Sequence, residues 1–336
     1  MGPSLPIPIA VVGTGALGSI HTRILASLPE AQLVGIVDPD RETADRVAAQ
    51  WKTESLRMED LYGRVKACVI ATPTSTHRAV AEPLLRAGIS CMVEKPLCRT
   101  IEEGEALVAA AEATGATLMV GHVERFNPVV LALLEENLKP RFLEAQRVSP
   151  YSFRSSDVGV VLDMMIHDID LILHLVPSDL VDVQAVGVAV IGDYEDMANA
   201  RLTFADGSVA NVTASRVALK TERKLRLLSE GTYVTMDFHK KRGRVVQLLE
   251  GVREKVRTGQ IRPGLLTPLQ AMTRKLVRTR ALKVGRHEEP LLLEDREFLR
   301  AVHEQREPLV SGRHGLRAMS AASRVTASIA NHLSSR

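Results

Sequence analysis

The first half of this chain takes its fold from Ile7-Pro8-Ile9-Ala10-Val11-Val12-Gly13-Thr14-Gly15-Ala16-Leu17-Gly18. The apolar run predicts a buried strand, and Pro8 is tolerated because it lies near the strand's start. The glycines follow at G-x-G-x-x-G spacing: Gly13 permits a tight turn, Gly15 lets a ligand approach the backbone, and Gly18 lets helix and strand pack closely. A helical stretch continues to about residue 28. We therefore predict a strand–turn–helix unit whose free N–H groups bind a pyrophosphate.

A second predicted strand, residues 33–37, ends in Asp38, about 20 residues beyond Gly18. A carboxylate at this place accepts hydrogen bonds from ribose hydroxyls and repels a 2′-phosphate, which favours NAD over NADP. Arg41 keeps NADP as the less favoured alternative. The residues that we predict to bind the dinucleotide in this region are Gly13, Thr14, Gly15, Ala16, Leu17, Gly18, Asp38 and Arg41.

Strands and helices continue to alternate, with further strands predicted at 67–71, 89–93 and 117–120. This alternation predicts a doubly wound parallel sheet with an α/β fold, in a domain that covers residues 1–123. Ligands bind outside the carboxyl ends of such strands. We therefore expect the residues that follow two of these strands to lie beside the cofactor: Thr72, Pro73, His77, Glu94 and Lys95.

The second half, residues 124–336, has a different pattern. Six segments between residues 181 and 249 read as successive strands, separated by turns such as Ala205-Asp206-Gly207. Such turns predict hairpins, and so a large, mostly antiparallel sheet in an α+β domain. The C-terminal helix is expected to pack back on the first domain. A sheet of this kind has a broad open face, so we expect a homodimer or homotetramer.

One segment of the second half, residues 162–176, carries ionisable side chains in an apolar run and predicts a buried helix of about four turns. Asp163, His167, Asp170 and His174 fall on one face of that helix. Such groups are costly to bury unless they are paired or used. Three interpretations are open: a satisfied polar seam, an acid–base site, and a metal site, since His and carboxylates at i, i+4 spacing suit zinc.

Composition limits the class of protein. The chain has 336 residues, a net charge of +3 and 3% aromatic residues, which does not favour a nucleic-acid partner. Its three cysteines show no paired spacing, and no apolar run reaches membrane-spanning length. We expect a cytoplasmic protein without an integral membrane segment. Ten Lys or Arg residues against three Glu lie between Gly251 and Pro290, either as a solvated surface excursion or as attraction for an anionic substrate or membrane surface.

Taken together, four motifs resemble the glucose–fructose oxidoreductase/inositol dehydrogenase (Gfo/Idh/MocA) family: the glycine fingerprint, Glu94-Lys95-Pro96, Arg125-Phe126-Asn127-Pro128 and Asp163-x-x-x-His167-Asp168. The resemblance covers essentially the whole chain. It implies a Rossmann domain followed by an open-faced sheet domain. It also implies that Lys95, Asp163 and His167 line the place where nicotinamide meets sugar. Segments 121–128 and 157–170 are most similar to members that oxidise the 3-hydroxyl of UDP-N-acetylglucosamine, ahead of lipid A biosynthesis.

The resemblance and the motifs together predict an NAD-dependent oxidoreductase that oxidises a secondary hydroxyl of a sugar, with a nucleotide sugar as substrate. The expected catalytic residues are Lys95, Asp163 and His167, without a metal ion. The expected substrate-binding residues are Lys95, His122, Arg125, Asn127, Asp163 and His167. Two alternatives remain open: a dehydrogenase of inositol or another free sugar, and a non-catalytic NAD-binding sensor or scaffold.

Overall fold

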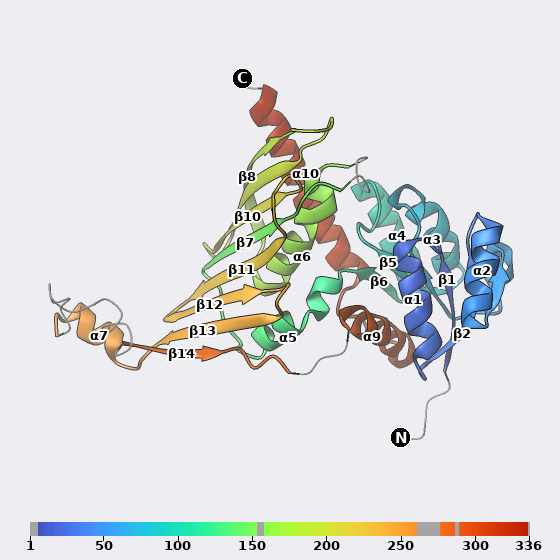
Figure 1. The fold of residues 1–336 in the computed structure, drawn as a ribbon, viewed down its shortest axis with the longest axis horizontal. Helices are drawn as coiled ribbons and strands as arrows, with labels where there is room; N and C mark the ends of the chain where they lie inside the picture. The colour runs from blue at the N-terminus through green and yellow to red at the C-terminus, as the bar shows by residue number, and fades with distance from the viewer. Residues whose placement is uncertain (1–5, 153–157, 261–275, 286–288, 335–336) are drawn as a thin grey trace. The chain divides into compact units, whose positions relative to one another are not determined.

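A computed structural model describes residues 6–152, 158–260, 276–285 and 289–334 (Figure 1). They fall into two compact units. One consists of Met1–Phe126 and Glu288–Ala321, and the other of Asn127–His287 and Ala322–Arg336. The last helix, α10 (Gly312–Ser334), therefore contributes residues to both units. Each unit has a sheet of its own.

The first unit contains a parallel sheet with the strand order β3-β2-β1-β4-β5-β6 among the described residues. Neighbouring strands are parallel throughout, which confirms the predicted doubly wound sheet. The strands are β1 (Ile7–Val12), β2 (Ala31–Val37), β3 (Glu54–Leu56), β4 (Ala67–Ile70), β5 (Ser90–Glu94) and β6 (Leu118–Gly121). The order reverses beside β1, and such a switch point opens a crevice at the carboxyl ends of the strands.

Helices connect these strands and cover the sheet. Helix α1 packs against α2 and α9, and α3 packs against α4. The helices of this unit are α1 (Ala16–Ser27), α2 (Arg41–Trp51), α3 (His77–Arg86), α4 (Ile101–Thr114) and α9 (Pro290–Glu304), with short 3-10 turns η1 (Met58–Leu61), η2 (Thr74–Thr76) and η3 (Val123–Phe126).

The sequence explains this packing locally. Ile9, Val11 and their neighbours in β1 are fully buried, because a parallel strand is covered on both faces. Helix α1 buries Gly18, Thr22 and Leu25 at helical spacing. Thr100 caps α4 by accepting the Glu103 N–H, at 3.2 Å.

The second unit contains a sheet with the order β14-β13-β12-β11-β7-β10-β9-β8. All neighbouring pairs are antiparallel except β7 and β10, which run parallel. The prediction of a large, mostly antiparallel sheet is thus confirmed. The strands are β7 (Phe142–Val148), β8 (Leu180–Val188), β9 (Met197–Phe204), β10 (Val209–Ser215), β11 (Glu222–Ser229), β12 (Thr232–Asp237), β13 (Arg242–Leu248) and β14 (Val277–Ala281).

Among the described residues of this unit, one face of the sheet is covered and the other is open. Leu225 and Leu227 of β11 are buried, whereas Arg226 and Leu228 between and beside them are exposed. Helix α6 (Ile166–Leu175) lies against β7 and β10, as Figure 1 shows. The remaining helical elements are α5 (Pro128–Leu134), the π-helical turn η5 (Val161–Met165) and α7 (Val252–Arg257).

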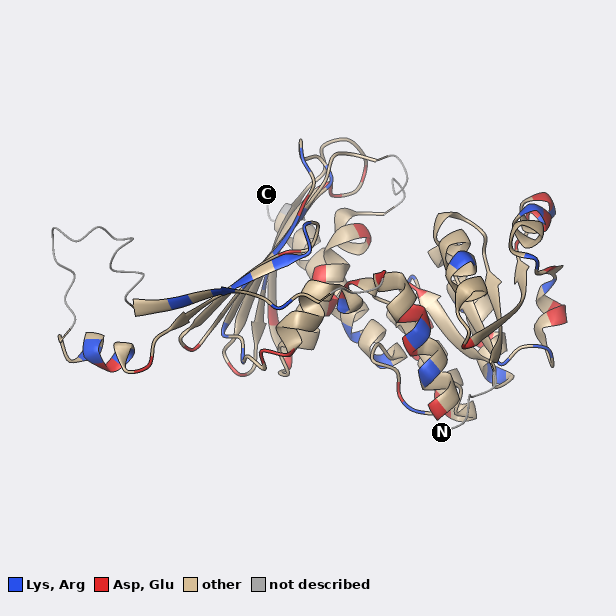
Figure 2. Cartoon of the chain, turned by 60° about the horizontal axis from the view of Figure 1, so that its bottom comes forward, with Lys and Arg blue, Asp and Glu red and all other residues tan. Residues whose placement is uncertain are grey.

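Some details differ from the sequence-based expectations. The helix expected over residues 162–176 is present from Val161 to Leu175, but its first turn, Val161–Met165, is π-helical rather than α-helical. The basic segment includes α7 and the edge strand β14, and Lys and Arg residues are blue in Figure 2. Arg280 on β14 donates to Glu136 at 2.7 Å. Four of its ten basic residues, Arg262, Arg274, Lys275 and Arg286, lie outside the described residues.

Candidate functional site

The predicted phosphate-binding loop has the geometry that a dinucleotide requires. Gly13 has a φ of +93°, and a Cβ there would lie 2.6 Å from the carbonyl oxygen of Ala71. A Cβ on Gly18 would collide with the Gly13 carbonyl oxygen. By contrast, no described atom lies within 4 Å of the Cβ position of Gly15, where α1 begins. Open space at Gly15, beside a helix N-terminus, leaves room for a pyrophosphate.

Asp38 connects the end of β2 to this loop. Its Oδ2 accepts hydrogen bonds from the Thr14 N–H at 2.7 Å and the Thr14 hydroxyl at 2.6 Å. Its Oδ1 accepts the Asp40 N–H at 3.0 Å. These bonds fix the orientation of the carboxylate, which is half-buried. Each carboxylate oxygen has more than one acceptor position, so Asp38 retains capacity for ribose hydroxyls.

The other residues predicted around the loop differ in exposure. Ala16 and Leu17 are exposed in the first turn of α1, whereas Thr14 is buried. Arg41 begins α2, and its guanidinium donates to the Leu56 carbonyl at 3.1 Å. Arg41 therefore has a backbone partner on β3.

The loop after β4 is held from inside by His77. Its Nε2 lies 2.9 Å from the Thr72 carbonyl oxygen, and its Nδ1 lies 3.0 Å from that of Pro96. The ring is buried. Its contacts thus join the Thr72–Pro73 loop to the loop that follows β5. His77 therefore holds these two loops together from a buried position.

Lys95 directly follows β5, at the carboxyl edge of the parallel sheet. Its side chain is half-buried, and its peptide bond to Pro96 is cis. The preceding Glu94 is buried, and its Oε2 accepts the Lys95 N–H at 3.2 Å. The turn that carries Lys95 is therefore fixed by Glu94 before it and by His77 after it.

Asp163 and His167 lie in the second unit, on η5 and at the start of α6. Both are half-buried, unlike Asp168 and Asp170, which are 1% exposed. π-Helical turns of this kind occur frequently at functional sites. Both residues are therefore partly accessible, whereas most of α6 is buried.

Buried Arg147 attaches α6 to the sheet. Its Nε lies 2.8 Å from Asp168 Oδ2 and its Nη2 lies 3.0 Å from Asp168 Oδ1. The side chains are 4% and 2% exposed. A bidentate pair of this kind fixes both the position and the rotation of the residue beside His167.

A second group of charges holds the start of η5. Arg216 donates to the Val158 carbonyl at 2.8 Å and to Asp196 at 2.7 Å. The neighbouring Glu195 accepts the Val161 N–H at 3.2 Å. A Cβ on Gly159 would collide with the Glu195 carboxylate, so only glycine leaves room for this contact. The helix that carries Asp163 and His167 is thus anchored at its N-terminal end by Glu195, which lies just before β9, and by Arg216.

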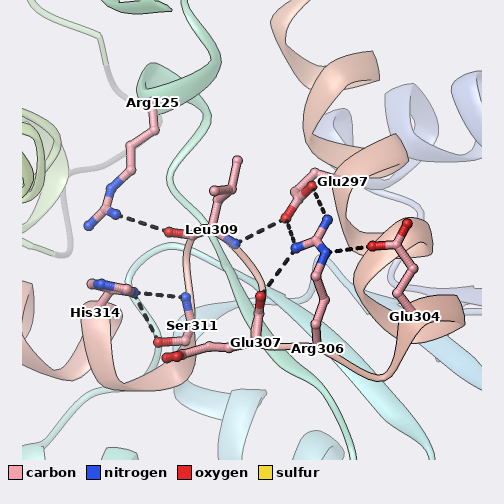
Figure 3. A network of polar contacts seen from close by, with 8 residues as sticks. All are labelled: Arg125, Glu297, Glu304, Arg306, Glu307, Leu309, Ser311 and His314. Carbon is pink, nitrogen blue, oxygen red and sulfur yellow. Dashed lines mark hydrogen bonds and ion pairs between the residues drawn. The ribbon is translucent and has the colours of Figure 1, made fainter. Parts of the chain in front are cut away.

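The predicted substrate residues after β6 are largely internal. His122 and Arg125 are buried, and Arg125 donates to the Leu309 carbonyl at 3.2 Å (Figure 3). Figure 3 also shows that Leu309 belongs to a loop fixed by Glu297, which accepts the Leu309 N–H and pairs with Arg306. Asn127 caps α5 by accepting the Val129 N–H at 3.1 Å.

Sequence reasoning did not identify the charged residues that hold these elements. They are His21, Arg147, Glu195, Asp196, Arg216 and Asp295. Their partners are distant in sequence, up to 274 positions in the case of His21 and Asp295, so spacing gives no signal. Buried charges in an apolar context were the one indication available.

The described residues contain no cluster of three or more His, Cys, Asp or Glu residues suited to a metal ion. Among the described helices, none has both the length and the apolar character needed to cross a membrane.

Comparison with known proteins assigns both halves of the chain. Residues 7–122 match the model of the oxidoreductase family with an NAD-binding Rossmann fold. Residues 139–235 match the GFO/IDH/MocA C-terminal domain. A UDP-N-acetylglucosamine 3-dehydrogenase from Acidithiobacillus ferrooxidans is 41% identical over 68% of this chain and 73% of its own length.

Other relatives act on other substrates. An inositol 2-dehydrogenase from Rhizobium meliloti is 28% identical over 64% of this chain and 70% of its own length. A solved structure of the Acidithiobacillus ferrooxidans enzyme superposes with a TM-score of 0.85 at 33% identity, covering 97% of this chain and 98% of that one. From the glycine loop, the two sheets and these matches, the chain belongs to the Gfo/Idh/MocA family of NAD-binding oxidoreductases.

Proposed function

We propose that this protein is an NAD-dependent dehydrogenase that oxidises the 3-hydroxyl of UDP-N-acetylglucosamine to the ketone. The observation that supports this substrate is the 41% identity to a UDP-N-acetylglucosamine 3-dehydrogenase over 68% of the chain. The likeness to the solved structure of that enzyme over 97% of the chain supports it.

NAD, when bound, supplies the acceptor for the hydride that leaves the carbinol carbon. Gly13, Gly15 and Gly18 hold its pyrophosphate, and Asp38 binds its adenosine ribose. The Asp38 carboxylate disfavours a 2′-phosphate, which makes NAD the preferred cofactor and NADP the weaker one. Thr72 and Pro73 border the same crevice from β4.

His167 takes the proton of the substrate hydroxyl on an imidazole nitrogen, because an imidazole titrates near neutral pH. Asp163, four positions earlier, stabilises the imidazolium that results. Lys95 donates a hydrogen bond from its ammonium group to the reacting oxygen and takes part in the proton relay. His122, Arg125 and Asn127 shape the substrate region through the elements that they hold.

The decisive experiment is to follow the NADH absorbance band with NAD and each of three substrates: UDP-N-acetylglucosamine, UDP-glucose and myo-inositol. We expect turnover with UDP-N-acetylglucosamine. The kcat of His167→Ala should fall about 100-fold while NAD still binds. Turnover with myo-inositol alone would replace the proposal by the second candidate, which the inositol 2-dehydrogenase relative supports. NAD binding without turnover on any sugar would favour a sensor or scaffold.

We also propose that the open face of the second sheet forms the interface of a homodimer or homotetramer. That face carries both signs of charge, for example Glu144 of β7 paired with Arg226 of β11 at 3.0 Å. Light scattering should give a multiple of the 36.7 kDa chain mass. A monomer at micromolar concentration would contradict this expectation.

A further inference from the structure

The first unit contains a buried charged cluster that the proposed chemistry does not use. His21 of α1 is fully buried between two carboxylates. Its Nδ1 lies 2.7 Å from Asp295 Oδ1, on α9, and its Nε2 lies 2.9 Å from Glu94 Oε1, at the end of β5. Three ionisable groups from three elements therefore meet inside the unit, directly before Lys95.

The imidazole in this cluster is charged when both carboxyl groups are ionised. An ionised carboxylate only accepts hydrogen bonds, so both ring nitrogens then carry a proton. Burial disfavours the imidazolium, but the carboxylates of Asp295 and Glu94 outweigh that effect and hold the pKa of His21 well above its ordinary value. The charged groups around the ring are Glu94, Asp295 and, beyond them, Lys95 and Glu289.

Glu94 connects this charge to the predicted catalytic turn. One of its carboxylate oxygens contacts His21, and the other accepts the Lys95 N–H at 3.2 Å. The facing residue on β6 is Gly121, and a Cβ there would lie 2.9 Å from the Glu94 carboxylate. The carboxylate is thus held by His21 of α1 and by the Lys95 backbone, and it occupies the space that Gly121 of β6 leaves open.

We propose that His21 is a positioning residue that acts on Lys95 through Glu94. It keeps the buried Glu94 ionised and in the orientation that holds the Lys95 peptide, while Asp295 keeps His21 charged. The inference rests on the proposed function, because it assigns Lys95 to the reacting oxygen. It also explains why a costly buried triad of charges lies behind a turn that faces the cofactor crevice.

A matched pair of substitutions tests the direction of this link. The amide nitrogen of His21→Gln takes the place of Nε2 and retains the hydrogen bond to Glu94. That of His21→Asn takes the place of Nδ1 and retains only the bond to Asp295. With NAD and UDP-N-acetylglucosamine, we expect kcat to be about 10- to 100-fold lower in H21N than in H21Q, with similar KM for NAD in both. Equal kcat in the two variants, or wild-type kcat in H21N, would overturn the proposal.

Asp295→Asn covers the case in which neither His21 variant folds. It retains an acceptor for Nδ1 but removes the charge that raises the pKa of His21. We expect kcat of D295N to fall with rising pH across a range in which the wild type is constant, because a neutral His21 no longer supplies the charge that keeps the buried Glu94 ionised. A pH profile identical to that of the wild type would overturn the proposal.

A measurement on Lys95 itself separates this inference from the proposed function. Reductive methylation with 13C-formaldehyde gives each lysine an NMR resonance, and Lys95→Arg identifies that of Lys95. The Lys95 resonance should shift in H21N and shift less in H21Q, which retains the donor to Glu94 although it lacks the charge. Absence of turnover on every sugar would refute the proposed function and leave this test intact. An unshifted Lys95 resonance in H21N would refute the link even in an active enzyme.

Discussion

The buried pair of Arg147 and Asp168 provides the sharpest prediction about how the His167 helix is held. Both side chains are almost inaccessible and meet through two contacts of 2.8 and 3.0 Å. Arg147→Met leaves the Asp168 carboxylate buried without its bidentate partner. Removal of one partner from such a pair costs about 3–5 kcal/mol. The pair does not represent that much net stability, because burial of both charges is itself costly.

The loss of stability caused by Arg147→Met should be measurable in unfolding experiments. A domain of this size has a free energy of unfolding of about 5–15 kcal/mol, and 1 kcal/mol corresponds to about 2–4 °C in Tm. We therefore expect R147M to lower the Tm of the second unit by about 6–20 °C. The double variant R147M/D168L removes both charges and should unfold within about 2 kcal/mol of the wild type.

The assay can assign the loss to the correct unit. Trp51, the single tryptophan, lies in α2 of the first unit, so its fluorescence reports on that unit, whereas far-ultraviolet circular dichroism reports on both sheets. In R147M the dichroism transition should move and NAD affinity should persist, while kcat falls because α6 carries His167. A double variant as unstable as R147M would refute the reasoning, as would an R147M transition within about 1 kcal/mol of the wild type.

Three further predictions concern the rest of the site. Gly18→Ala should weaken NAD binding at least 10-fold in calorimetry, because its Cβ would collide with the Gly13 carbonyl oxygen; an unchanged Kd would contradict this. Asp38→Ser should lower the ratio of kcat/KM for NAD to that for NADP about 10-fold or more, since the repelling carboxylate is gone, and a constant ratio would exclude that role. Burial opposes the ionisation of Asp196, but two backbone N–H groups and Arg216 outweigh it and lower its pKa to about 2. Asp196 therefore stabilises the fold fully above the unfolded value of 3.8 and less as pH falls toward 2. Urea unfolding at about pH 5 and about pH 3 should show a loss that is smaller in D196N.

The architecture was predictable where each element has a local signal. The glycine spacing after β1, the strand ends at Asp38 and Glu94, and the hairpin turns of the second half all act over a few residues. Helix α2 and strand β3 were not predicted, because Arg41–Trp51 is mostly polar and Glu54–Leu56 has only three residues. The apolar residues Ala44 and Val47, which are buried in α2, give only a weak helical periodicity in this sequence.

The residues that hold the elements of the candidate site in place could not be predicted in the same way. The sequence 162–176 indicates one regular helix, but the π-helical turn at Val161–Met165 depends on Glu195, Asp196 and Arg216, which approach from the sheet. His21 occupies an ordinary position on the buried side of α1, and only the tertiary structure brings Asp295 to it. Interactions between distant residues leave no periodicity in the sequence.

The two predicted proton-handling elements share one physical design. The Lys95 turn is fixed by the buried charges of His21 and Glu94, and the His167 helix is fixed by the buried pair of Arg147 and Asp168. Apolar packing alone tolerates small rotations and shifts, whereas a bidentate ion pair inside a protein has a single good geometry and a large penalty when it is broken. Within each unit, fixed charges thus hold the reactive group without themselves being exposed to substrate. Residues that contact the sugar are then free to differ between relatives on one scaffold, which is how a family with this frame can include both UDP-N-acetylglucosamine and inositol dehydrogenases.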